Sequence, residues 1–307
     1  MRTINLGNTG FQVPVIAVGF WRADKLANKA EADAFVKSAV DYGAYFFDHA
    51  DVYGRGVAEE MFAEAIGMCP AVRENIVIQT KCGIRPGVAF DFSRDHILKS
   101  VDLSLNRLKT EYIDILLLHR PDALMEPEEV AEAFGILQGT GKVRYFGVSN
   151  QNPMQIELLR KYVKQPIVAN QLQLSIAHAG MIRHGIHVNT MDDAGLDRDG
   201  SVLDYCRLHD ITIQPWSPFQ YGFDQGVFLG DKKFPELNAK IDEIAKKYSV
   251  SNTTIAMAWL LRHPARFQPI TGTMKSARLL DCIKAAEVTL TRDEWYAIYL
   301  AAGNILP

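Results

Sequence analysis

The chain has 307 residues, with 33 Lys and Arg against 36 Asp and Glu, so its formal net charge is −3. Such a near-neutral balance gives no support to a protein that binds the nucleic-acid backbone. The longest uninterrupted apolar run, residues 255–261, is far shorter than the ~20 residues of a membrane-spanning helix. We therefore expect a globular protein with a large core and with neither nucleic acid nor a membrane as a partner.

The cysteines and the N-terminus indicate a reducing compartment. Cys69, Cys82, Cys206 and Cys282 are far apart and contain no CxxC pair, which predicts free thiols rather than a disulfide framework or a zinc site. The first ten residues, MRTINLGNTG, lack the apolar core of a signal peptide, so we expect a cytoplasmic protein.

Short runs rich in β-branched or aromatic residues alternate with longer segments whose apolar residues are three and four apart. The predicted strands are residues 14–20, 44–50, 75–81, 113–119, 143–150, 167–173, 211–217 and 267–273. Helical spacing is clearest after residue 33, after Ser93, which we expect to be an N-cap, and after Pro127. Strands that alternate with helices indicate βα units and a parallel sheet.

Eight such units close into a (β/α)8 TIM barrel, and a doubly wound open sheet is the alternative. No GxGxxG follows the first strand, where an open dinucleotide-binding sheet would carry it. Polar residues instead gather at the C-terminal ends of several strands, which is the active-site face of a barrel. We therefore predict an α/β barrel that occupies residues 1–307 as one domain.

Three segments lie outside the eight units. Residues 1–13 read as an N-terminal β-hairpin that would plug the barrel, residues 174–200 as a long loop after strand 6, and residues 288–307 as a C-terminal helical extension with Thr291 as its cap. We expect the last two to lie over the substrate end of the barrel. The loop contains a DRDG segment, but it lacks the spacing and the terminal Glu of a calcium loop, so we expect a lid or a contact surface rather than a metal site.

Four ionisable residues follow three consecutive strands. Asp48 ends the second strand and Tyr53 comes five residues later; Lys81 ends the third strand and His119 the fourth. Adjacent strands are only about 4.8 Å apart, so these side chains should converge. A lysine ammonium favours the phenolate of a neighbouring tyrosine, an aspartate keeps that ammonium charged, and a neutral histidine can hydrogen-bond a carbonyl oxygen. Taken singly, each residue is more often structural, but the joint pattern predicts proton delivery to a carbonyl that receives a hydride from a nicotinamide.

The segments FFDHADVYG, VIQTKCG, LLLHRPD and FGVSN occur in this order, and together they resemble the aldo-keto reductase superfamily, in particular its bacterial oxidoreductases. The resemblance extends from the N-terminal hairpin to ITGTMKSAR near the end of the chain. It implies reduction of an aldehyde or ketone, with Tyr53 as the general acid, Asp48 and Lys81 tuning it, and His119 polarising the carbonyl.

The same resemblance assigns residues to the cofactor. Ser149, Asn150 and Gln171 would hydrogen-bond the nicotinamide carboxamide, and Trp216 would stack on the ring in place of the more usual Tyr. Ser217 and Pro218 continue the loop that runs along the pyrophosphate.

The segment 270–278 resembles the adenosine-phosphate site of the family and includes Gly272 and Thr273. Lys275 and Arg278 would grip one phosphate at a helix start, which favours NADPH because only NADPH carries a 2′-phosphate. The chain departs from the pattern at 280–282, where Leu-Asp-Cys replaces the frequent Glu-Asn, so no adenine contact is predicted there.

On the substrate side, Phe20 and Trp21 match a loop that lines the pocket in relatives, which would suit an apolar or aromatic carbonyl compound. Two other functions remain open from the sequence. One is a nicotinamide-binding regulatory subunit with little turnover. The other is a barrel in which Lys81 forms a Schiff base.

Overall fold

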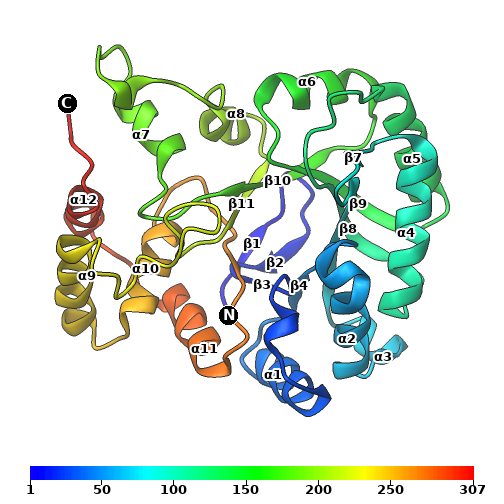
Figure 1. The fold of residues 1–307 in the computed structure, drawn as a ribbon, viewed down its shortest axis with the longest axis horizontal. Coiled ribbons are helices and arrows are strands. Elements are labelled where there is room, and N and C mark those ends of the chain that lie inside the picture. Colours follow the sequence, from blue (N-terminus) through cyan, green and yellow to red (C-terminus); the bar gives the residue numbers. More distant parts are fainter.

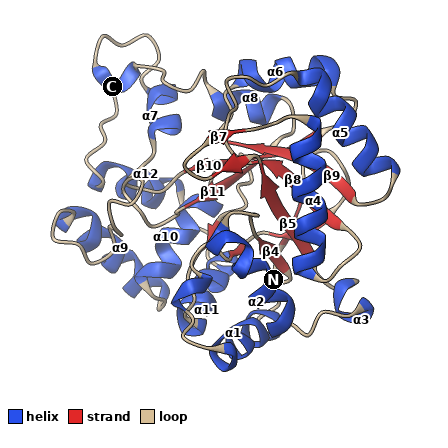
Figure 2. Ribbon diagram, turned by 45° about the vertical axis from the view of Figure 1, so that its right-hand side comes forward, coloured by secondary structure: helices blue, strands red, loops and turns tan.

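Eight parallel strands form the centre of the computed structural model, which describes residues 1–307. Neighbouring strands in space follow one another along the chain, with β12 beside β3. The strands are β3 (Ala17–Gly19), β4 (Phe46–Asp48), β5 (Val77–Cys82), β8 (Ile113–Leu118), β9 (Val143–Ser149), β10 (Ile167–Gln173), β11 (Thr212–Trp216) and β12 (Ile270–Thr271). Figure 2 shows them as a core surrounded by helices.

The sheet is nearly closed. No ladder joins β11 to β12, but the Gln268 backbone N–H donates to the carbonyl oxygen of Ile213 at 3.0 Å, so the two ends of the sheet meet. The carbonyl oxygen of the next residue, Pro269, accepts the N–H of Ala17 on the opposite side, at the start of β3. The arrangement confirms the predicted (β/α)8 barrel.

Helices surround the barrel (Figure 1). They are α1 (Lys29–Asp41), α2 (Val57–Ala65), α3 (Pro70–Arg73), α4 (Arg94–Leu108), α5 (Pro127–Gly139), α6 (Pro153–Tyr162), α7 (Gly180–Ile186), α8 (Val202–Leu208), α9 (Pro235–Tyr248), α10 (Asn252–Leu261), α11 (Ser276–Lys284) and α12 (Arg292–Ala301). The predicted caps are confirmed: the Ser93 side chain accepts the His96 N–H, and Thr291 forms a capping box with Glu294.

The first 14 residues form the predicted hairpin, with β1 (Thr3–Asn5) antiparallel to β2 (Gln12–Pro14). Leu6 and Val13 are fully buried and pack with residues that point into the barrel, including Phe46 and Leu117. The hairpin therefore plugs the N-terminal end. Pro14, assigned from sequence to the first barrel strand, belongs to the hairpin instead, and the barrel strand itself is only the three residues Ala17–Gly19.

The two remaining additions meet each other. The long loop contains α7 and a single 3-10 turn (Asp193–Gly195). The tail after α12 runs toward α7 (Figure 1), and His187 Nε2 lies 3.2 Å from the carbonyl oxygen of Ile305. A small antiparallel pair that the sequence did not reveal, β6 (Ile84–Arg85) and β7 (Ala89–Phe90), follows β5.

Two other sequence expectations can be compared with the structure. All four cysteines are free thiols, as predicted. None of the helices has the length and apolar character needed to cross a membrane.

Candidate active site

The four predicted residues converge at the C-terminal ends of adjacent strands. Asp48 ends β4, Lys81 lies in β5 directly beside it, and His119 follows β8. Tyr53 begins a tight 3-10 turn (Tyr53–Gly56), whose first N–H donates to the carbonyl oxygen of Ala50. The turn brings the Tyr53 hydroxyl back over Lys81, although 28 residues separate the two in sequence.

Lys81 is the centre of the cluster. Its side chain is completely buried, and Nζ lies 2.9 and 2.8 Å from the two carboxylate oxygens of Asp48, 2.7 Å from the His49 carbonyl oxygen and 3.0 Å from Tyr53 Oη. Burial disfavours the ammonium, but Asp48 and Tyr53 outweigh it and raise the pKa of Lys81. A buried, charged and fully partnered ammonium is no amine nucleophile, so the geometry argues against Lys81 as a Schiff-base residue.

The Lys81–Tyr53 hydrogen bond sets the direction of the tyrosine proton. An ammonium has only donors, so Tyr53 Oη must accept this bond. The phenolic hydrogen is then free to point elsewhere, and Tyr53 lines an open cavity. The hydroxyl is therefore arranged to donate into that cavity.

Two opposing effects set the pKa of Tyr53. Burial raises it, and although Lys81 lowers it, the net direction is upward. Lys81 therefore acts in the expected direction, but desolvation of the phenolate outweighs the effect of this one neighbouring cation. Tyr53 is consequently protonated at neutral pH, the state that an acid requires.

His119 faces the same cavity, and its ring centroid is 5.9 Å from that of Tyr53 at a nearly perpendicular angle. Burial, Lys81 and Arg120 hold the pKa of His119 well below its usual value, so the imidazole is neutral, as expected. Its Nδ1 is buried and has no hydrogen-bond partner.

A chain of buried glutamines that sequence reasoning missed supports Asp48 from inside the barrel. Gln79 Nε2 donates to Asp48 Oδ1 at 2.6 Å, and Gln79 and Gln214 donate to one another at 2.9 and 3.0 Å. Gln214 donates to Gln268, which donates to the Pro14 carbonyl oxygen at 2.7 Å. The carboxylate at the top of the barrel is thus connected to the hairpin at its bottom. Gln79 and Gln214 are 135 residues apart, so no local motif could reveal the chain.

A cavity of about 700 Å³ lies above Asp48, Tyr53 and His119. Every residue that the resemblance assigns to the cofactor lines it, except Lys275: Ser149, Asn150, Gln171, Trp216, Ser217, Pro218, Gly272, Thr273 and Arg278. Lys275 is exposed at the N-cap of α11 and does not reach the cavity. The structure therefore does not bring Lys275 and Arg278 to the cavity wall together.

Hydrogen bonds fix one wall of this cavity. Trp216 Nε1 donates to Asn150 Oδ1 at 3.2 Å, Asn150 Nδ2 donates to Ser149 Oγ at 2.7 Å, and Ser149 Oγ donates to the Gln171 carbonyl oxygen at 3.1 Å. The Gln171 amide donates to Asp48 at 3.1 Å, so Gln171 connects this wall to the buried carboxylate.

Of the two residues expected on the substrate side, only one reaches the cavity. Trp21 lines the cavity and is 42% exposed. Phe20 is fully buried among Phe35, Phe47 and Phe62 and does not reach the cavity. The structure therefore does not bring Phe20 to the substrate side, because Phe20 follows β3 and packs in the same helix-covered cluster as Val18.

Several cavity residues were not predicted. Arg22 and Arg120 each follow a predicted residue directly, and Asn252 and Thr253 begin α10 close to the 270–278 segment. For Asn252 and Thr253, the sequence offered only Ser251 as a helix cap. A cap indicates where a helix begins, but it does not indicate that the helix begins beside a cavity.

A second cavity of about 900 Å³ adjoins the first and is walled largely by the long loop and α7. Arg120, Asn150, Trp216 and Phe223 line both. The loop therefore lies beside the candidate site, as expected, whereas no residue of the C-terminal extension lines either cavity. The extension contacts the loop instead.

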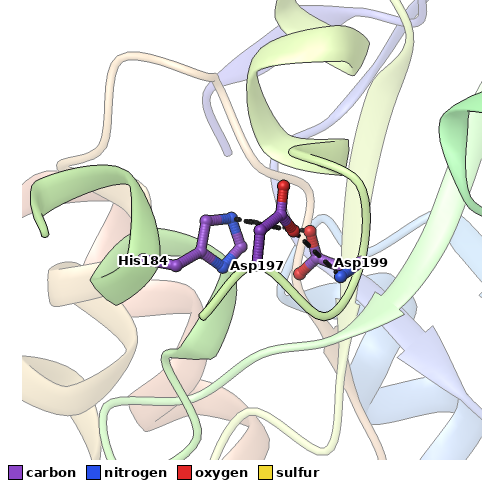
Figure 3. Close-up of side chains that lie close together, drawn as sticks. All are labelled: His184, Asp197 and Asp199. Atoms are coloured by element: carbon purple, nitrogen blue, oxygen red, sulfur yellow. Dashed lines mark hydrogen bonds and ion pairs between the residues drawn. The ribbon is translucent and has the colours of Figure 1, made fainter. Parts of the chain in front are cut away.

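In the wall of the second cavity, His184 of α7 points at the carboxylates of Asp197 and Asp199 (Figure 3). Its Nε2 is 3.8 Å from Asp197 Oδ1 and 3.5 Å from Asp199 Oδ1. Asp197 Oδ1 also accepts the backbone N–H groups of Asp199 and Gly200, so the cluster folds the DRDG segment against α7.

The sequence matches the aldo/keto reductase family over residues 15–300. It is 37% identical to "Uncharacterized oxidoreductase YcsN" of Bacillus subtilis over 92% of each chain, and 34% identical to "6-dehydroglucose reductase" of Novosphingobium aromaticivorans over 98% of this chain and 96% of that one. The structure resembles the thermostable aldo-keto reductase Tm1743, solved with the inhibitor epalrestat, with a TM-score of 0.79, 27% identity and coverage of 98% and 100%.

The chain belongs to the aldo/keto reductase family. Members of this family are oxidoreductases that act on carbonyl compounds and generally use a nicotinamide cofactor.

Proposed function

We propose that this single-domain barrel reduces an aldehyde or ketone to an alcohol with NADPH, and that Tyr53 is the general acid. The observation that carries the proposal is the Lys81–Tyr53 hydrogen bond of 3.0 Å at the cavity floor, which leaves the phenolic hydrogen free to donate. When bound, NADPH supplies the hydride that reduces the carbonyl carbon.

The chain's own residues handle the proton. The Tyr53 hydroxyl donates to the carbonyl oxygen as negative charge develops there. Lys81 then stabilises the phenolate through the bond it already makes, and Asp48 keeps the ammonium charged and oriented. Neutral His119 orients the carbonyl oxygen, and Trp216 and Phe223, whose ring centroids are 6.0 Å apart, form an aromatic wall beside it.

The residues along the cavity fit the cofactor. Asn150 and Ser149 offer polar atoms beside the Trp216 indole, which suits an amide-bearing aromatic ring. At the other end, Gly272, Thr273 and Arg278 line the cavity at the start of α11, where the backbone N–H groups favour an anion. Arg278 is the residue we propose for the 2′-phosphate, with Lys275 contributing only from the exposed rim.

The test is NADPH consumption with a panel of small aldehydes and ketones, comparing wild type with Tyr53→Phe. Loss of a general acid lowers kcat by about 10²- to 10⁴-fold, while NADPH binding, followed by quenching of tryptophan fluorescence, should remain. Tyr162→Phe, which removes a phenol from the outer helix α6, is the matched control. Full activity in Tyr53→Phe would show that the acid is wrongly assigned.

Cofactor choice is tested separately by titration with NADPH and NADH. Arg278→Ala should weaken NADPH by about tenfold or more, the worth of a charge-assisted hydrogen bond, with little effect on NADH. Lys275→Ala should have a smaller effect because Lys275 is outside the cavity. Equal loss of both cofactors in Arg278→Ala would contradict the assignment.

A further inference from the structure

The two cavities meet at a wall that also belongs to the candidate active site. Trp216 and Arg120 line both, so a molecule whose carbonyl lies at Tyr53 and His119 can extend past them toward α7. The second cavity contains three arginines in its lining, Arg120, Arg183 and Arg198. This composition differs from the apolar pocket that the sequence led us to expect.

Arg120 is an unpaired cation at the junction. Its guanidinium lies 5.5 Å from the centroid of the Trp216 ring, and it is close enough to Tyr53 to lower the pKa of that phenol. Burial lowers the pKa of Arg120 itself, and the group opposing this effect is Tyr53 rather than a carboxylate. A half-buried guanidinium without an anion retains most of its capacity to bind one.

Arg183 approaches the same cavity from α7. Its Nε is buried and has no hydrogen-bond partner, an arrangement that native structures rarely leave without a reason. Burial, together with the charge of Arg183, lowers the pKa of His178, another lining residue. The imidazole therefore adds a neutral hydrogen-bonding group rather than a further charge.

The acidic residues in this wall do not neutralise the two arginines. Asp199 accepts the Val202 N–H at 3.2 Å and faces His184, as Figure 3 shows. Asp193 is exposed, beginning the 3-10 turn of the loop. Neither carboxylate forms a salt bridge with Arg120 or Arg183, whereas Asp199 is only 3.5 Å from the imidazole of His184.

We propose that Arg120 and Arg183 form an anion-binding subsite, so that the preferred substrate carries a carboxylate or phosphate group in addition to its carbonyl. This inference rests on the proposed function for the position of the carbonyl. The anion would enter the second cavity and accept N–H bonds from both guanidinium groups, while the carbonyl remains beside Tyr53. Planar guanidinium groups suit both carboxylate and phosphate oxygens.

The test compares three aldehydes of one shape: 4-carboxybenzaldehyde, 4-formylphenyl phosphate and the neutral methyl 4-formylbenzoate. Wild type should prefer at least one of the two anionic aldehydes over the ester by about tenfold in kcat/KM. The anion that is preferred shows whether the substrate carries a carboxylate or a phosphate group. Arg183→Gln should reduce that ratio to near one, and Arg183→Lys should restore part of it. Arg292→Gln, on the exposed start of α12, is the control and should leave the ratio unchanged.

A calorimetric measurement of benzoate and phenyl phosphate binding to the protein tests this inference separately from the proposed function. Binding that weakens about tenfold in Arg183→Gln supports the subsite even if no aldehyde is reduced. Reduction of the ester without any preference for an anion overturns the subsite and leaves the proposed function standing. An anion preference that survives both Arg183→Gln and Arg120→Gln also overturns it.

Discussion

Replacing Lys81 by Met tests whether the buried charges at the barrel centre depend on one another. Asp48 is only 2% exposed, and the substitution removes both of its bonds to Nζ, of 2.9 and 2.8 Å. Gln79 and Gln171 still donate to Oδ1, at 2.6 and 3.1 Å. The carboxylate would therefore keep hydrogen bonds but lose its counter-charge.

Removing one partner of a buried ion pair costs about 3–5 kcal/mol, because it leaves an uncompensated buried charge. The remaining glutamine donors place Lys81→Met near the lower end, at about 3 kcal/mol. Asp48→Asn removes the counter-charge of the ammonium, which keeps only neutral acceptors such as the His49 carbonyl oxygen and Tyr53 Oη, and should cost a similar amount. The double variant buries no charge, so its cost should be only about 2–3 kcal/mol, the worth of the lost hydrogen bonds. The two single effects are thus expected to be non-additive by about 3 kcal/mol.

Urea unfolding followed by far-UV circular dichroism measures these free energies, provided that the dependence on urea is the same in all variants. Lys29→Met is the control: its pair with Asp33 is exposed and should contribute less than about 1 kcal/mol. Additivity of the Lys81 and Asp48 effects within about 0.5 kcal/mol would refute the reasoning.

Three further predictions concern the surroundings of the site. Burial and Glu59 raise the pKa of Asp51 to about 7, so ionisation of this carboxyl lowers the stability of the wild type as pH rises from about 4 to about 7. Asp51→Asn should remove this loss. If the urea midpoints of wild type and variant change equally between acidic and neutral pH, the prediction is contradicted. Burial and Lys81 lower the pKa of His49 to about 3, and its neutral ring packs against Phe20, so the folded protein loses stability as pH falls below about 6.5. In His49→Phe the free energy of unfolding should depend less on pH in this range. An unchanged dependence on acidic pH would count against this prediction. A Cβ on Gly83, whose φ is 103°, would lie 2.2 Å from the Phe92 side chain, whereas a Cβ on Gly87, whose φ is 72°, would meet open space. Gly83→Ala should therefore lower the free energy of unfolding in urea by about 2 kcal/mol more than Gly87→Ala. Equal losses would exclude the clash as the cause.

Much of the fold could be predicted from local patterns. Each barrel strand is a short apolar run between helical segments, and Ser93 and Thr291 cap helices through their own neighbouring N–H groups. Alternation and capping depend on residues close in sequence, so they can be read without knowing the fold. The convergence of Asp48, Lys81 and His119 was also predictable, because the C-terminal ends of parallel barrel strands always open on one face.

The properties that depend on burial and on side-chain direction were decided by the tertiary structure. Only packing shows that Phe20 faces the core and that Lys275 lies outside the first cavity. Only packing shows that Arg120 and Arg183 both line the second cavity. Only packing shows that desolvation outweighs Lys81 in setting the pKa of Tyr53. The sequence by itself determined the barrel, its order of strands and the residues gathered at its mouth. The charge state and surroundings of those residues were decided by groups far apart in the chain, since both depend on how completely the folded protein excludes water.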